Sequence, residues 1–176
     1  MNFRFAILVT SLLIFGCDNR PTSPDARQVY ASALPTVASG IEHFTIEAKK
    51  VQLGTGNQVP SKEKIDEFGR FSFSGSSSHF TKSDFPNLDV TLMSDADLEE
   101  IASSDCEAYW SNFRAKSQES TGLLRISEVG FSESGAEAVF YVEGGSGCTA
   151  GRGVLVFMRL EAGQWVVANL HELWVS

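Results

Sequence analysis

Residues 136–143 read AEAVFYVE and residues 154–160 read VLVFMRL, and these two segments decide the fold. In the first segment, Ala138, Phe140 and Val142 fall at every second position, as expected for a strand. The second segment is almost continuously apolar, which is typical of a central strand covered on both faces. We therefore expect two consecutive strands, the second of them at the centre of a sheet.

Short turns connect these segments to two more candidate strands. Before them, residues 124–127 alternate between apolar and polar side chains, and residues 134–135 (Ser-Gly) are a turn signal. After them, residues 161–164 turn into the largely apolar segment 165–170. The C-terminal part is therefore predicted to be an antiparallel meander of about four strands.

Three helices are predicted before this meander. Residues 25–38 have apolar side chains at helical spacing, and we expect an interruption near Pro35. Residues 95–102 follow Ser94, which suits the N-cap position. Residues 104–116 form the third helix, whose apolar stripe predicts that its large aromatic side chains lie in the core. The stripe consists of Cys106, Tyr109, Trp110 and Phe113.

The region between the first two predicted helices has weaker signals. Residues 43–53 and 89–93 are candidate strands, and Phe71 and Phe73 alternate with serines in a third short extended segment. Residues 54–67 are mostly polar, so we expect a loop there.

Helices packed on one face of an antiparallel meander give an α+β architecture. At the level of the fold alone, this arrangement is analogous to cystatin-like and nuclear-transport-factor-like folds. The chain length suits a single domain, which we place at residues 28–176, after a segment of residues 1–16 and a polar, Pro-containing tether of residues 17–27.

The composition excludes several classes of protein. The chain has 176 residues and a formal net charge of -8. Nucleic-acid binders carry a surplus of Lys and Arg that neutralises phosphates, and this chain has the opposite balance. Direct binding to an anionic membrane surface is disfavoured for the same reason.

The N-terminus has the pattern of a signal peptide. Arg4 supplies the positive charge, and residues 5–15 form a short apolar stretch. As a helix, that stretch would be about 16 Å long, roughly half the thickness of a hydrocarbon core. We therefore expect an export signal of residues 1–16 rather than a permanent membrane span.

The segment Ile14-Phe15-Gly16-Cys17 resembles the lipobox of bacterial lipoproteins, although Phe15 is larger than the usual residue at its position. The resemblance implies cleavage before Cys17, lipidation of Cys17, and a membrane anchor made of fatty acyl chains. Asp18 then favours retention in the inner membrane. The alternative is an ordinary secreted protein with an odd cysteine.

The C-terminal third also resembles a family of uncharacterised bacterial exported proteins and lipoproteins. The shared features are a Ser-x-Val-Gly-Phe strand at residues 127–131, a Gly-x-Trp hairpin at 163–165 and a closing Trp-Val-Ser at 174–176. This resemblance implies an envelope location, and it brings no activity and no catalytic residues.

Cys106 and Cys148 remain once Cys17 is assigned to lipid. An even pair in an oxidising compartment predicts a disulfide, and two separate buried thiols are the alternative. The glycine-rich residues 144–153 lack the pattern of a phosphate-binding loop or a nucleophile elbow, so we interpret them as a flexible hairpin loop.

The remaining polar residues do not form a recognisable catalytic or metal-binding pattern. His43, His79 and His171 are scattered, so we expect no metal site and no cofactor. A cluster of acidic residues is explained by the favourable field at the start of the helix that follows Ser94. The cluster consists of Asp95, Asp97, Glu99 and Glu100.

Three functions are compatible with these patterns. The first is a non-enzymatic, membrane-tethered envelope domain that binds another protein or a small ligand in a groove between helix and sheet. The second is an acidic inhibitor or immunity protein directed against a basic envelope hydrolase. The third is an envelope hydrolase that uses a serine or Cys148 of the glycine-rich segment.

Overall fold

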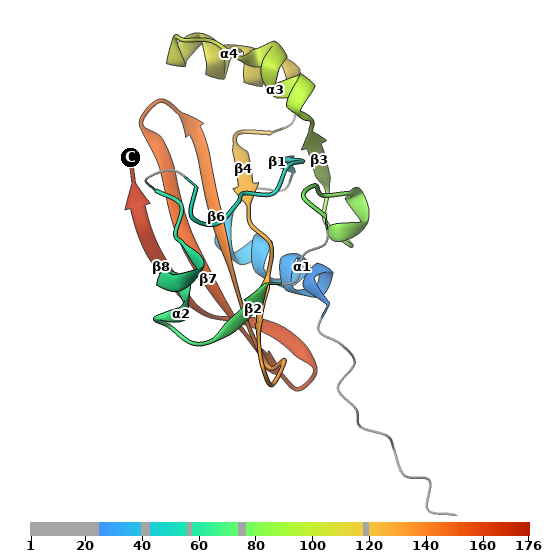
Figure 1. The fold of residues 1–176 in the computed structure, drawn as a ribbon. Coiled ribbons are helices and arrows are strands. Elements are labelled where there is room, and N and C mark those ends of the chain that lie inside the picture. Colours follow the sequence, from blue (N-terminus) through green and yellow to red (C-terminus); the bar gives the residue numbers. More distant parts are fainter. Residues whose placement is uncertain (1–24, 40–42, 56–57, 74–76, 118–119) are drawn as a thin grey trace, which may run out of the picture.

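A computed structural model describes residues 25–39, 43–55, 58–73, 77–117 and 120–176. These residues form one α+β domain whose strands belong to a single mixed sheet, in the order β2-β5-β6-β4-β1-β3, with β7 and β8 following β6 on its other side (Figure 1). The helices are α1 (Ala26–Val37), α2 (Lys62–Asp66), α3 (Asp95–Ile101) and α4 (Cys106–Lys116), with a 3-10 helix at Lys82–Asp84. The strands are β1 (Phe44–Glu47), β2 (Phe71–Phe73), β3 (Val90–Met93), β4 (Leu123–Ile126), β5 (Gly130–Ser132), β6 (Glu137–Gly147), β7 (Ala150–Glu161) and β8 (Gln164–Val175).

The predicted C-terminal meander is confirmed. Strands β4, β6, β7 and β8 pair antiparallel in this succession, and the central part of β7 is buried. The turn into β8 places Ala162 and Gly163 at positive φ values of 50° and 83°, which is the backbone of a tight hairpin turn. The sheet is larger than the meander, because β1 joins it in parallel with both β3 and β4.

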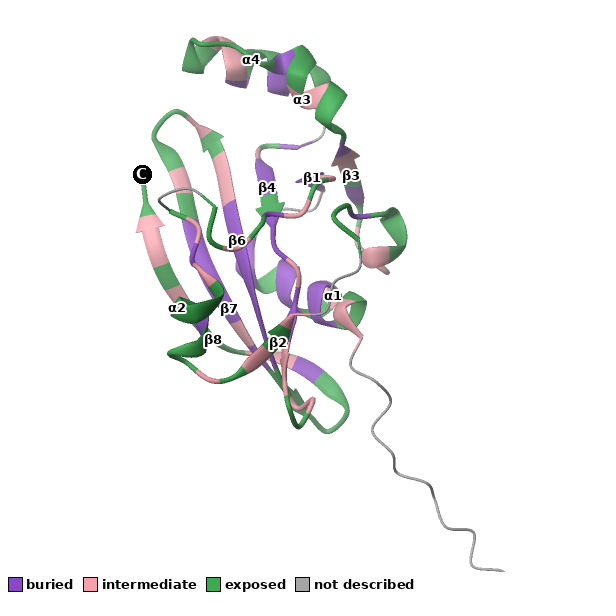
Figure 2. Cartoon of the chain, in the orientation of Figure 1, coloured by how far each residue is buried: buried purple, intermediate pink, exposed green. Residues whose placement is uncertain are grey.

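Alternation along β6 divides the core between the two faces of the sheet. Phe140 and Val142 face α1 and belong to the larger apolar cluster, whereas Val139 and Tyr141 belong to a second cluster on the opposite face. Figure 2 shows the buried residues gathered on α1 and along the middle of β6 and β7. The second cluster includes Ile65, so a helix also covers part of the face opposite α1.

Two local expectations are wrong. The predicted loop at residues 54–67 contains α2, whose Ser61 side chain accepts a hydrogen bond from the Lys64 amide at 3.2 Å and whose Ile65 is fully buried. One buried side chain and one cap are enough to fold this short polar turn. Helix α1 is also not interrupted at Pro35, because Pro35 lies on the exposed side of the helix, where the carbonyl left without a partner can face water.

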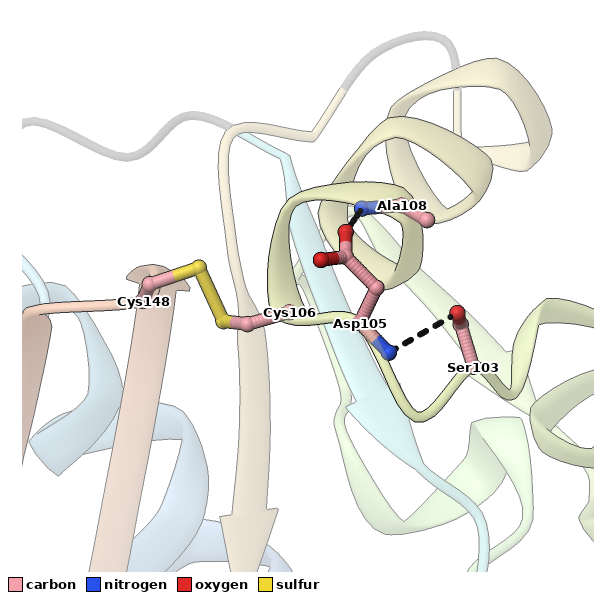
Figure 3. The surroundings of a disulfide bond; sticks show 5 residues. All are labelled: Ser103, Asp105, Cys106, Ala108 and Cys148. Atoms are coloured by element: carbon pink, nitrogen blue, oxygen red, sulfur yellow. Dashed lines mark hydrogen bonds between the residues drawn. A yellow bond between two sulfur atoms is a disulfide. The ribbon is translucent and has the colours of Figure 1, made fainter.

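The predicted disulfide is present and joins Cys106 at the start of α4 to Cys148 at the tip of the β6–β7 hairpin (Figure 3). Asp105 caps α4 by accepting a hydrogen bond from the Ala108 amide at 2.8 Å. Trp110 and Phe113 then pack with Leu123 in a third apolar cluster, as the apolar stripe predicted. The disulfide therefore fixes one end of α4 to the end of the sheet.

Two buried tyrosines predict that the protein loses stability at alkaline pH. Burial is the main cause that raises the pKa of Tyr30 and of Tyr141 far above the usual value. Above about pH 10 the unfolded chain loses these phenol protons while the folded protein keeps them, so unfolding becomes more favourable as the pH rises. Urea unfolding at about pH 8 and about pH 10.5 should show this loss. Tyr30→Phe and Tyr141→Phe should each reduce it, and an unchanged pH dependence in both variants would refute the assignment.

Candidate functional site

An apolar cavity of about 420 Å³ lies where the sheet extends beyond the C-terminal end of α1. We call it the helix–sheet cavity. Val37 and Ala38 line it from the helix, and the ends of β4, β6, β7 and β8 line the rest. Its volume falls in the range of about 300–1,000 Å³ that is usual for small-molecule sites. The other lining residues are Ser39, Thr121, Gly122, Leu124, Val142, Gly144, Gly145, Ser146, Ala150, Gly151, Arg152, Val154, Val175 and Ser176.

Glycines let neighbouring residues pack closely against the backbone at this end of the sheet. Along β6, the alternation that points Phe140 and Val142 toward α1 continues to Gly144, which has no side chain. A Cβ atom built on Gly144 would lie 2.7 Å from Cδ2 of Leu124, so the neighbouring strand already occupies the space beside this backbone. The end of the hairpin is therefore lined mainly by backbone, and the cavity forms where α1 no longer covers it.

Residues 144–153 are therefore not a flexible loop, and this prediction is wrong. Gly144 to Gly147 belong to β6 and Ala150 to Gly153 belong to β7, so only Cys148 and Thr149 lie between the strands. Glycines weaken strands, but here the disulfide and the continued pairing hold the backbone in place.

Arg152 is the one charged side chain among the described residues that line the helix–sheet cavity. Its guanidinium donates a hydrogen bond to the carbonyl oxygen of Val37, at the end of α1. A cation at this position complements the negative end of the helix dipole. Arg152 is exposed overall, so the charge lies at the edge of the cavity rather than in the core.

A polar groove of about 260 Å³ lies at the same end of the sheet, next to Trp110 and Trp174. There Glu143 is 8% exposed, and each of its carboxylate oxygens accepts one hydrogen bond, from Arg125 and from the Tyr141 hydroxyl. The Tyr141 hydroxyl in turn accepts a hydrogen bond of 2.9 Å from the Trp174 indole. These polar groups supply hydrogen-bond partners for one another, as buried polar groups in a folded protein require.

Arg125 holds this network together electrostatically. Its Nε also donates to Glu47 at 2.7 Å, so two carboxylates share one guanidinium. Burial works against the charged form of Arg125, but Glu143 and Glu47 outweigh it and raise the pKa of Arg125. We assign the network to the structure of the sheet.

Comparison of the chain with protein-family models, with curated proteins and with solved structures gave no match. The resemblance of the C-terminal third to exported proteins stays a prediction, as does the analogy to cystatin-like and nuclear-transport-factor-like folds.

The structure describes only some of the residues that the sequence analysis singled out. Cys17 lies outside the described residues, as do the signal segment of residues 1–16 and Asp18. Cys106 and Cys148 are bonded to each other, which leaves Cys148 without the free thiol that the cysteine version of the hydrolase alternative requires. In the described part of the chain, no helix is both long and apolar enough to cross a membrane.

The three histidines do not come together. Nδ1 of His43 lies 2.9 Å from a carboxylate oxygen of Asp89, His79 contacts the Ser78 hydroxyl, and the His171 ring packs on Phe68. No group of three potential metal ligands occurs among the residues that the structure places.

Of the acidic cluster, Asp97 supports the start of α3 as predicted, whereas Glu100 lies near the other end of this helix. The Ser94 hydroxyl and Lys116 hold the pKa of Asp97 well below its usual range. Asp97 also accepts a hydrogen bond from the Ser94 amide, and Lys116 contacts Glu100 as well. These contacts fix the start of α3 against the end of α4.

Sequence reasoning expected a groove between helix and sheet but did not identify the residues that line it or single out Arg152. The lining comes from the end of α1 and from the ends of four strands, and no local pattern shows that these ends meet.

Proposed function

We propose that this chain is an exported, membrane-tethered binding module that takes a small apolar ligand into the helix–sheet cavity. The helix–sheet cavity is the observation that supports this proposal. Its lining combines apolar side chains from α1, β4, β6, β7 and β8 with a few polar groups, which is the composition of a small-molecule site.

Two further observations support export and tethering. A disulfide between residues 42 positions apart is typical of proteins that fold in an oxidising compartment. The lipobox-like residues that end in Cys17 support an acyl anchor in a bacterial envelope membrane. The described domain itself begins at residue 25, so a short tether would separate it from that anchor.

Ala150→Trp tests the cavity as the binding site. Ala150 is exposed and lines the cavity near the hairpin tip, so an indole there should fill the space without disturbing the core. We expect the uncharged fluorescent probe phenylnaphthylamine to bind the native protein and to bind this variant at least about tenfold more weakly. Fluorescence titration measures both affinities.

Thr149→Trp is the matched control, because Thr149 is exposed at the same turn but is not among the residues that line the cavity. It should bind the probe as the native protein does. Equal affinities in all three proteins would show that the probe binds elsewhere, and no binding to the native protein would refute the proposed function.

The anchor is tested by intact mass of the protein extracted from membranes of the native host without reduction. We expect a chain that begins at Cys17, carries acyl groups, and lacks two hydrogens because of the disulfide. An unprocessed chain in the cytosol would contradict export and tethering.

A further inference from the structure

We infer that the ligand of the helix–sheet cavity is a single-chain amphiphile with an anionic head group, whose chain occupies the cavity while Arg152 binds the head. This inference rests on the proposed function and adds the chemical class of the ligand. It is carried by Arg152, the one charged side chain among the described residues that line the cavity.

The interior of the cavity suits a hydrocarbon chain. Leu124, Val142 and Val154 are buried and present their side chains from three neighbouring strands, and Val37 adds to them from α1.

Arg152 has donors left for a ligand. A guanidinium has five N–H donors in a planar fork that matches a carboxylate or phosphate, and Arg152 uses one nitrogen for the Val37 carbonyl. Within the described part of the chain, no carboxylate forms an ion pair with Arg152. Arg125, by comparison, is held by both Glu47 and Glu143. Arg152 is therefore the cation at this end of the sheet that can still accept an anion.

The lining of the cavity also contains hydroxyl groups that suit an anionic head group. Four hydroxyl side chains lie among its lining residues, those of Ser39, Thr121, Ser146 and Ser176. The Ser176 hydroxyl donates to the Gly151 carbonyl oxygen, and the other three can donate to an anionic oxygen. A cationic head would be repelled by Arg152, and an uncharged hydroxyl head could accept a hydrogen bond from Arg152 but could not form the bidentate ion pair that a carboxylate forms.

Three ligands that share one chain test the inference on the full-length protein. Decanoate, decanol and decyltrimethylammonium have the same tail and an anionic, a neutral and a cationic head. Isothermal titration calorimetry at about pH 8, where a carboxyl group is ionised, should give decanoate an affinity about tenfold higher than that of decanol, and decyltrimethylammonium the lowest affinity.

Variants of Arg152 test whether the charge of this side chain causes the preference for decanoate. Arg152→Gln should remove the preference for decanoate and leave decanol binding within about twofold, whereas Arg152→Lys should retain most of the preference. Arg159→Gln is the matched control, because Arg159 lies exposed on the same strand and pairs with Glu161 instead of lining the cavity. It should leave all affinities unchanged.

The outcomes separate this inference from the proposed function. Equal affinities for decanoate and decanol in the native protein would overturn the head-group assignment and leave the apolar site intact. If Arg152→Gln weakened the binding of decanoate and decanol equally, Arg152 would act by holding the end of α1 at Val37 and so shaping the cavity. That result would also overturn the head-group assignment. Binding of none of the three ligands would refute the proposed function itself.

Discussion

Replacing Cys106 and Cys148 together by serine should lower the free energy of unfolding by about 4 kcal/mol. The bond closes a loop between residues 42 positions apart, and loss of this restraint enlarges the conformational freedom of the unfolded chain. The variant should also melt at a temperature lower by about 10 °C. Chemical unfolding followed by circular dichroism measures the first quantity, and calorimetry measures the second.

Reduction of the native protein provides the matched comparison. The reduced native protein and the double variant should have the same stability, because neither has the cross-link. If a reductant leaves the native protein as stable as before, the bond does not contribute to the fold in the way we describe.

Glu143→Ala should lower the free energy of unfolding by about 3 kcal/mol, near the lower end of the range for breaking a buried ion pair. The substitution leaves the Tyr141 hydroxyl without its acceptor and removes one of the two carboxylates that hold Arg125. The loss is moderated because Arg125 is partly exposed and keeps Glu47. Urea unfolding gives the free energy directly.

Glu137→Ala is the control for this substitution, because Glu137 is an exposed carboxylate on the same strand. It should change the free energy of unfolding by less than about 0.5 kcal/mol. Glu143→Ala should still bind decanol, because Glu143 is not among the residues that line the helix–sheet cavity. If a stable Glu143→Ala variant no longer bound decanol, we would conclude that the ligand binds in the polar groove. That result would contradict our assignment of the network to the structure of the sheet.

The strands and the longer helices could be predicted because their patterns are strong and local. The stripe that contains Trp110 and Phe113 has helical spacing, and both side chains are buried in α4. The continuous apolar run in β7 indicated a strand covered on both faces, and residues from it lie in both of the larger apolar clusters. In these segments, local periodicity and tertiary packing agree.

The remaining features depend on contacts between distant segments. Helix α2 forms because Ile65 completes a cluster with Val139 and Tyr141, far along the chain, and its own short sequence is mostly polar. The glycine-rich strand ends were interpreted as a loop because glycine lowers strand propensity, whereas pairing along the whole hairpin outweighs that preference. A groove between helix and sheet was expected, but its lining residues could not be predicted, since they depend on how α1 lies above the sheet.

The most direct test of the central claim is methyl NMR of the protein titrated with decanol. If the ligand enters the helix–sheet cavity, the largest shift changes should occur at the methyl groups of Val37, Leu124, Val142 and Val154, and those of Ile65 and Val59 on the opposite face should stay unchanged. The largest changes at Ile65 and Val59, or no saturable change at any methyl group, would contradict the claim that this cavity binds an apolar ligand.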